Sequence, residues 1–318
     1  MHRFFRALLP WIAAAALAAG AASAAQAATT EWWVVVARFD SGDQLLVEFT
    51  LTDVGPGERN AAAIGHWIAK DGTLTPFQRA KLGSDWKPSP DGRRIDLGKF
   101  VFDRSAARAQ LRVEKKSLRI ALDFPLAAQP IATKKFAAGK WTQELWTGGA
   151  AAEASLWKTG FAQPLRTRGR VAVSRRRIEG PEARLAARRL EAFSLASEPL
   201  YVVEVAKGKS AERWVVALDA EGAVGGEDFA RLAVSEKLGA VSPRLALSGS
   251  VAKGALLAGK LLTSYDPLAE LPGLIRVVLG LRLRSAFTAS PFDVSVRVGA
   301  RVQRREGTAI ASYTFYAE

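Results

Sequence analysis

Hydrophobic and polar residues alternate along most of the chain after residue 31, with a period of two. The clearest example is the set Leu45, Val47, Phe49 and Leu51, which is interleaved with mainly polar neighbours. The same alternation runs through residues 118–124, 293–303 and 309–315. A period of two is typical of a β-strand with one dry face and one wet face, so the pattern predicts antiparallel sheet.

Turn-forming residues separate these alternating segments. Asp40–Asp43 is expected to close a hairpin between strands at 32–38 and 44–52. Lys115–Ser117 and Arg305–Gly307 are expected to act as turns in the same way. About fifteen short strands result, at the spacing of all-β barrels and sandwiches.

So many strands exceed one small barrel and favour two β units. A basic, Pro-containing stretch near residues 160–169 predicts the division, which gives domains at 28–163 and 164–318. Few helices are expected. Glu182–Phe193 fits a basic helix or a twisted strand, and Pro272–Leu279 fits a short apolar helix.

The first 27 residues predict a secretory signal peptide. Arg3 and Arg6 form a basic start, an uncharged Ala-rich stretch follows, and Ala25-Gln26-Ala27 matches a cleavage site. An uncleaved membrane anchor is the alternative, but alanine gives little hydrophobic drive for insertion. The mature protein is therefore expected to be exported, either periplasmic or secreted.

The formal net charge of +14 adds a candidate partner. Basic residues gather at Lys134–Lys135, 166–189 and 297–305, and they are interpreted first as a solvated charged surface. Contact with an anionic membrane surface is the alternative. Export argues against a nucleic-acid partner.

The absence of cysteine removes disulfides, thiol catalysis and zinc–thiolate sites. Only two histidines exist, and His2 lies in the predicted leader, so a His-based site must use His66. The Gly-containing segment Asp53–Glu58 lacks the Lys-Ser/Thr of a phosphate-binding loop. We expect no cofactor and no metal.

Several motifs resemble one family. Glu31-Trp32-Trp33 is followed by the strand Gln44–Thr52, the loop Asp53–Gly57 and the strand Ala62–Trp67. Weaker support comes from Tyr265-Asp266 and Leu271–Arg276. The chain is similar to the double-lipocalin superfamily, which includes carotenoid 1,2-hydratases, AttH-like bacterial proteins and fungal survival-factor proteins. The resemblance implies an all-β fold of two consecutive lipocalin-like antiparallel barrels.

An eight-stranded barrel is wide enough to hold one small ligand, so its inner face supplies the candidate binding residues. These candidates are Trp33, Phe49, His66, Trp67 and Trp146. An inward His66 would orient a ligand or move a proton, whereas the alternative is a hydrogen-bonded structural histidine. For Trp33, core packing is the favoured interpretation, because large aromatic side chains dominate protein cores.

Tyr265 and Asp266 are the remaining catalytic candidates, with His66. An aspartic acid in an apolar cavity has a raised pKa and could protonate an alkene. The alternative is an Asx turn before Pro267.

Three functions fit these observations. The sequence favours an exported carrier that holds a hydrophobic small molecule, a lipid or an isoprenoid, in an apolar cavity. The second is a hydratase, isomerase or cyclase acting on such a molecule. The third is an outer-membrane β-barrel.

Overall fold

The computed structural model of the chain is almost entirely β-structure. It describes residues 29–53, 59–81, 85–86, 88–195, 199–218, 224–227, 232–233, 245–248, 252–257, 263–265, 283–298 and 301–316. The predicted leader and the predicted helix at Pro272–Leu279 lie outside these residues. The chain divides into two compact units, Met1–Thr133 with Lys140–Pro181 and Lys134–Gly139 with Glu182–Glu318.

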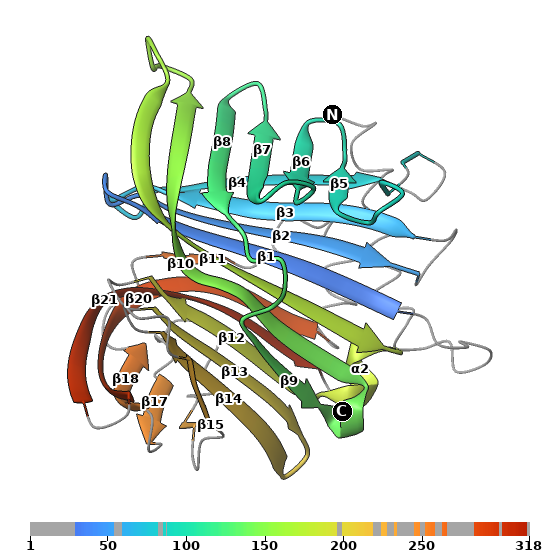
Figure 1. Cartoon of the computed structure of the whole chain (residues 1–318), viewed down its shortest axis with the longest axis vertical. Helices are drawn as coiled ribbons and strands as arrows, with labels where there is room; N and C mark the ends of the chain where they lie inside the picture. Colours follow the sequence, from blue (N-terminus) through green and yellow to red (C-terminus); the bar gives the residue numbers. More distant parts are fainter. Residues whose placement is uncertain are drawn as a thin grey trace. The chain divides into compact units, whose positions relative to one another are not determined.

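One antiparallel sheet makes up the first unit, with the strand order β4-β3-β2-β1-β11-β10-β8-β7-β6-β5 (Figure 1). The strands are β1 Thr29–Phe39, β2 Gln44–Thr52, β3 Asn60–Ile68, β4 Leu74–Lys81, β5 Arg94–Asp96, β6 Phe100–Asp103, β7 Arg108–Glu114, β8 Leu118–Pro125, β10 Trp141–Lys158 and β11 Leu165–Glu179. β9 (Ala132–Phe136) and a short 3-10 turn (Ala137–Gly139) fall where the two units divide. The hairpin expected around Asp40–Asp43 is confirmed as β1–β2.

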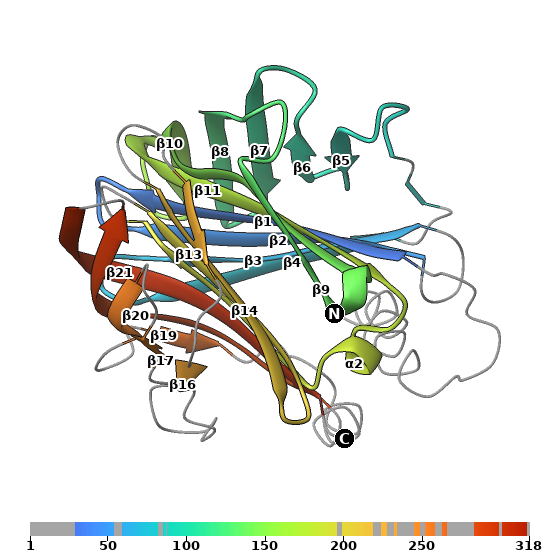
Figure 2. The same ribbon diagram turned by 60° about the horizontal axis from the view of Figure 1, so that its bottom comes forward.

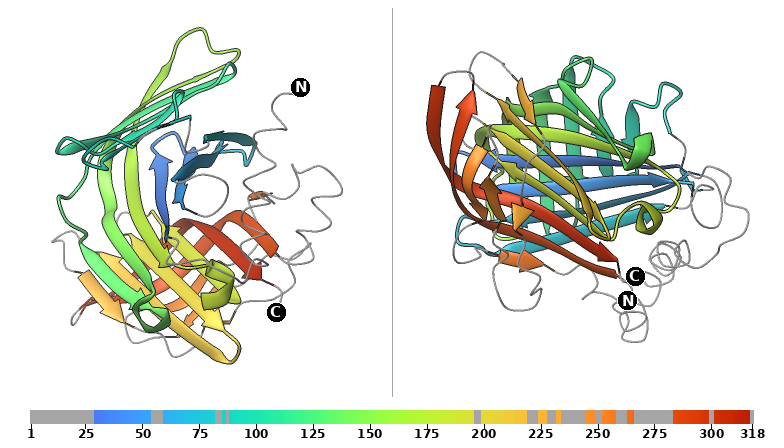
Figure 3. Two further views of the ribbon diagram at one scale, coloured as in Figure 1. Left: turned by 90° about the vertical axis from the view of Figure 1, so that its right-hand side faces the viewer. Right: turned by 90° about the horizontal axis from the view of Figure 1, so that it is seen from below.

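The sheet curls because its two longest strands bend. The pairing of β10 with β11 shifts register twice, between Leu145 and Thr147 and between Gly148 and Ala150. Bulges of this kind bend a strand and increase its twist. β7 and β8 consequently run across the direction of β1–β3 (Figures 1 and 2), and the bend of β10 and β11 is visible in Figure 3. The first unit is thus a curled half-barrel.

Side chains from both halves of this sheet fill the interior of the half-barrel. Its largest members are aromatic: Trp33, Phe39, Phe49, Trp67, Phe77, Phe100, Phe102 and Phe124. Phe39 stacks on Trp67 with ring centroids 5.0 Å apart, and Phe49 stacks on Phe102 at 5.7 Å. Aromatic packing of this kind stabilises the fold beyond the area it buries.

The prediction of one solvent-exposed face and one buried face is confirmed for only one half of the sheet. β7 and β8 alternate strictly between exposed and buried positions, which confirms the prediction for residues 118–124. In β1 and β2 both faces are buried from solvent. Val36 and Leu46 on the outer face are buried, as Val35 and Val47 on the inner face are. The prediction of a solvated face was therefore wrong for β1 and β2.

The second unit repeats the connectivity of the first (Figure 2). Its sheet has the order β15-β14-β13-β12-β21-β20-β18-β17-β16, so in each unit the first strand pairs with the last. The elements are α2 Glu182–Leu185, β12 Arg188–Ser194, β13 Leu200–Lys207, β14 Ser210–Leu218, β15 Val224–Glu227, β16 Leu232–Ala233, β17 Leu245–Ser248, β18 Ala252–Leu257, β19 Thr263–Tyr265, β20 Leu283–Val298 and β21 Arg301–Tyr316. Closure of this unit into a barrel stays a prediction.

Three details differ from the sequence-based expectations. The units divide at Pro181 rather than at residue 163, because β11 pairs with β1 and β10 of the first unit. The segment 182–193 is neither a helix nor a strand throughout, since α2 is followed directly by β12. Residues 293–303 are not one strand: β20 ends at Val298 and β21 begins at Arg301, and the turn expected at 305–307 lies within β21. No helix among the described residues could span a membrane.

Gly169 allows β11 to approach β1 closely. A Cβ atom at this position would lie 2.3 Å from the Arg38 carbonyl oxygen and 2.9 Å from the Phe39 Cα. Because both atoms belong to the backbone, Gly169→Ala must separate the strands, and we expect a loss of about 1–3 kcal/mol in the free energy of unfolding. Urea denaturation measures the loss. Thr167→Ala, two residues earlier, is the control and should change it by less than about 0.5 kcal/mol.

Candidate functional site

Charged and aromatic side chains meet on the inner face of the half-barrel. We call this group the Trp33 cluster, and its members are Glu31, Trp33, Phe102, Arg104, Glu144, Trp146 and Arg175. Trp33 lies at the centre, with ring centroids 5.9 Å from Phe102 and 5.2 Å from Trp146. In this cluster, four charged side chains gather beside the apolar core.

Strand register brings the cluster together. Trp33 on β1 lies directly opposite Phe49 on β2 and Arg175 on β11. Arg175 in turn lies opposite Glu144 on β10. Residues directly opposite in an antiparallel pair project from the same face, so these four form one row across the sheet.

Arg175 joins two carboxylates. Its Nη2 lies 3.0 Å from Glu31 Oε2, and its Nη1 lies 3.4 Å from Glu144 Oε2. Burial opposes the charged guanidinium, but the attraction of Glu31 and Glu144 outweighs it and raises the pKa of Arg175. The side chains of Arg175 and Glu31 are 25% and 24% exposed, so solvent reaches the cluster from one side.

Each carboxylate also accepts a hydrogen bond from an indole. Trp33 Nε1 donates to Glu31 Oε1, and Trp146 Nε1 donates to Glu144 Oε2 at 2.9 Å. The arrangement therefore holds the two carboxyl groups in fixed positions beside two aromatic rings.

Arg104 completes the cluster from the segment between β6 and β7. Its guanidinium carbon lies 3.7 Å from the centroid of the Trp33 ring, within cation–π range. Nη2 donates to the Gly92 carbonyl oxygen at 2.8 Å. Burial lowers the pKa of Arg104 to about 10, so the group is still charged at neutral pH.

The residues predicted to line a cavity are only partly brought together. Trp33, Phe49 and Trp67 belong to the core of the half-barrel, and Trp146 packs against it. Of the adjacent Trp32 and Trp33 side chains, Trp33 faces the interior. His66 lies on the other face of β3.

His66 is buried away from the Trp33 cluster. It lies opposite Leu46 and Pro76 in the sheet and is 1% exposed. Burial lowers the pKa of His66 to about 4, so the imidazole is neutral at pH 7. On the same face Arg176 lies 3.9 Å from Glu48 and stacks over Trp32 at 4.1 Å.

The other two catalytic candidates add no contact to this site. Tyr265 ends β19, and only its backbone is described. Asp266 lies outside the described residues. In the part of the chain that the structure describes, no group of three or more His, Cys, Asp or Glu side chains could hold a metal ion.

Sequence reasoning missed Arg104, Glu144 and Arg175. The sequence did carry a signal for Arg175, which is the run Arg175-Arg176-Arg177 in an extended basic stretch. Because side chains alternate between the two faces of a strand, one or two of these arginines must point towards the core. Their partners depend on the pairing of β1 with β11 and of β10 with β11. The first of these pairings brings Glu31 to Arg175, which is 144 positions away in the sequence. No local pattern encodes such a pairing.

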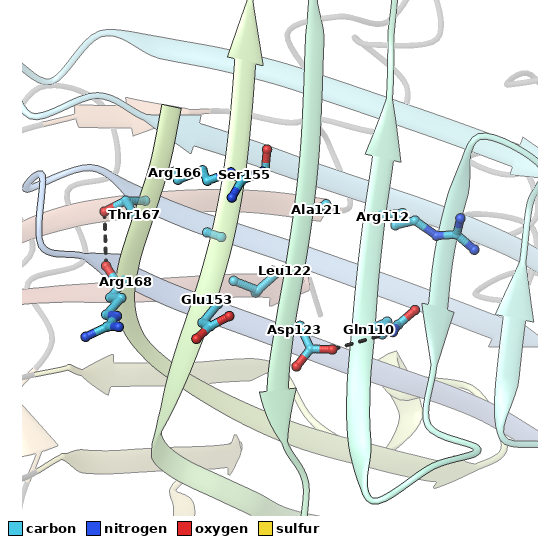
Figure 4. Close-up of a pocket in the computed structure, with 11 residues that line it drawn as sticks. Gln110, Arg112, Ala121, Leu122, Asp123, Glu153, Ser155, Arg166, Thr167 and Arg168 are labelled. Atoms are coloured by element: carbon cyan, nitrogen blue, oxygen red, sulfur yellow. Dashed lines mark hydrogen bonds between the residues drawn. The ribbon is translucent and has the colours of Figure 1, made fainter. Parts of the chain in front are cut away.

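An open groove lies on the outer face of the same sheet (Figure 4). It has a volume of about 660 Å³ and crosses β7, β8, β10 and β11. Ala121 and Ser155 form its low centre, with Arg112 and Arg166 at the two ends. The groove is separate from the filled interior, and its walls are mostly charged and polar.

The sequence matches no protein-family model and no curated protein. Solved structures, in contrast, match over most of the chain. Their likeness shows the fold, and it includes an AttH-type protein, as the resemblance seen in the sequence implies.

Three of these structures illustrate the likeness. An AttH-type protein from Nitrosomonas europaea matches with a TM-score of 0.59 and 14% identity, over 92% of this chain and 93% of that one. Kievitone hydratase from Nectria haematococca matches at 0.54 and 10%, over 90% and 88%. CghA bound to Sch210972 matches at 0.57 and 11%, over 92% and 89%. At these identities the likeness shows the fold, and one of the neighbours is named as a hydratase.

Proposed function

We propose that the chain is an enzyme of the hydratase, isomerase or cyclase type, which acts on a largely apolar substrate at the Trp33 cluster. The observation that carries the proposal is a pair of fixed carboxylates, Glu31 and Glu144, beside the indoles of Trp33 and Trp146. A hydratase among the structural neighbours supports the same class of reaction.

The carboxylates suit the role of general base. Each accepts from Arg175 and from an indole, so its oxygens are held in a fixed direction, as a group that removes a proton from a bound molecule requires. In a hydration, one carboxylate would take a proton from water as the water oxygen bonds to one alkene carbon. The carboxyl group formed in this way then returns the proton to the other alkene carbon, so the carboxylate is regenerated and the net change is the addition of one water.

The aromatic side chains suit the rest of the substrate. Trp146 is half-buried and presents apolar ring surface next to the carboxylates, and the buried rings of Trp33 and Phe102 pack behind it. Ring faces also stabilise positive charge that develops on carbon, which aids isomerisation and cyclisation of polyenes.

A carrier of a lipid or isoprenoid is the second candidate function, and the same aromatic surface favours it. The interior of the half-barrel is packed with side chains such as Phe49, Trp67 and Phe102, so a ligand of either kind would lie at the partly exposed side of the Trp33 cluster. We rank the carrier below the enzyme because a carrier makes no use of the two fixed carboxyl groups. Export and contact with an anionic membrane stay sequence-based predictions.

Turnover of a substrate panel tests the enzyme. Purified protein is incubated with apolar α,β-unsaturated ketones and polyenes in H₂¹⁸O, and products are followed by mass spectrometry. We expect label incorporation or isomerisation, and we expect Glu31→Gln and Glu144→Gln each to lower kcat/KM at least 100-fold, as loss of a general base does.

Glu153→Gln is the matched control, since Glu153 is exposed on β10 outside the cluster. It should leave kcat/KM within twofold. Conversion that survives in the Glu31→Gln/Glu144→Gln double variant would show that the chemistry lies elsewhere. Tight binding of panel members without any conversion would favour the carrier.

A further inference from the structure

We propose that the substrate carries an acidic oxygen group, a carboxylate or an enolate, which Arg104 binds as an anion at the edge of the Trp33 cluster. This inference deepens the proposed function and rests on it, because it names the class of molecule that the same site accepts. The arguments come from the charges, the hydrogen-bond donors and the geometry around Arg104.

The charges of the cluster are unevenly paired. Arg175 lies within ion-pair distance of both Glu31 and Glu144. Within the described part of the chain, no carboxylate lies within ion-pair distance of Arg104. Burial lowers the pKa of Arg104 to about 10, and the attraction of Glu31 from beyond ion-pair distance offsets only part of that effect. An anion bound directly to Arg104 would offset more of it.

Two buried donors in the cluster are also unused. Arg104 Nε and Arg175 Nε are inaccessible to solvent and donate to no acceptor. Most buried polar groups in folded proteins are hydrogen-bonded, and an exception calls for an explanation such as a ligand. Guanidinium nitrogens are donors only, so the group that satisfies them must be an acceptor.

The orientation of Arg104 suits an oxygen pair. Its guanidinium stacks on the face of Trp33 at 3.7 Å, and its Nη2 is tied to the Gly92 carbonyl oxygen. Both contacts fix the plane of the group. The edge of a guanidinium held in this way can receive two oxygens of a planar anion side by side.

The aromatic rings beside Arg104 indicate the chemistry of the rest of the substrate. Trp146 is half-buried and lies against Trp33, so its ring supplies apolar surface beside the expected position of the anion. A long apolar chain or ring system with one acidic oxygen group fits both features. A neutral hydrocarbon would leave the donors unpaired.

Binding of matched fluorescent probes tests this inference without any need for turnover. The probes are cis-parinaric acid and its methyl ester, which share one polyene chain and differ in the charge of the head group. Titration of the full-length protein at pH 7.5 is expected to give at least tenfold tighter binding of the acid. In Arg104→Met the acid should bind at least tenfold more weakly, whereas binding of the ester should change less than threefold.

Two further variants keep the result interpretable. Arg112→Met removes an exposed arginine from the outer groove, and it should leave both affinities within twofold of the wild type. Arg104→Lys keeps the charge but loses the planar pair of donors, so it should retain part of the preference for the acid. It serves as the folded variant if circular dichroism shows that Arg104→Met does not fold.

Equal binding of acid and ester by the wild type would overturn the inference, as would an unchanged preference in Arg104→Met. Neither result depends on the proposed enzyme function. A protein that hydrates neutral enones with equal binding of the two probes would retain the function and lose the anion site. A protein that prefers the acid but converts nothing would retain the anion site and lose the enzyme.

Discussion

Trp33→Ala is expected to lower the free energy of unfolding by about 3–5 kcal/mol, the range seen when a large buried aromatic side chain is truncated. The Trp33 side chain is 1% exposed and packs against Phe102 and Trp146. Its loss would also remove the ring under the Arg104 guanidinium. Urea denaturation followed by circular dichroism measures the change.

Trp157→Ala is the control for this measurement. Trp157 lies on β10 but outside the core, where Arg119 stacks on it at 5.0 Å. The control should cost about 1 kcal/mol or less, since little apolar packing is lost. A loss below about 1.5 kcal/mol for Trp33→Ala would mean that the interior of the half-barrel is loosely packed around this position.

His66 is expected to make stability depend on pH. Its pKa is about 4 in the folded chain and 6.5 when unfolded, because burial disfavours the charged imidazole. The unfolded state therefore binds the proton first. The contribution is fully present above pH 6.5 and is lost as the pH falls towards 4, by about 3 kcal/mol for a shift of this size.

The measurement compares wild type and His66→Gln between pH 7 and pH 4. Carboxylates titrate in both proteins, so the difference between the two curves isolates the histidine. His2 is the other histidine of the chain and lies in the predicted leader, so His66 dominates this difference. Parallel stability curves would contradict the buried, neutral state of His66.

Local patterns predicted the strands well and their partners poorly. The alternation of Leu118, Ile120 and Leu122 with exposed residues gave β8 its correct face, because a half-solvated strand is visible in a single segment. β1 and β2 are buried on both faces, and there the polar positions no longer mark the surface. His66 illustrates the consequence, since its face could not be assigned from its neighbours alone.

The candidate site depended even more on distant pairing. Trp33 stood out as part of a Trp pair in the sequence, and the structure does place it in the core. Arg104, Glu144 and Arg175 come from three other segments, and each looks like an ordinary surface charge in its own stretch of sequence. Their proximity results from the closing of β11 against β1 and from the bulges in β10.

The pairing of the first strand with the last has a consequence for how the chain folds. One edge of β1 pairs with β2, and the other pairs with β11, where Thr29 lies opposite Glu179. This second edge has no partner until some 150 intervening residues have left the ribosome. Contacts of such high sequence separation form slowly, and an open strand edge invites association with other chains in the meantime. The nascent first unit is therefore exposed to aggregation for as long as β11 has not been synthesised.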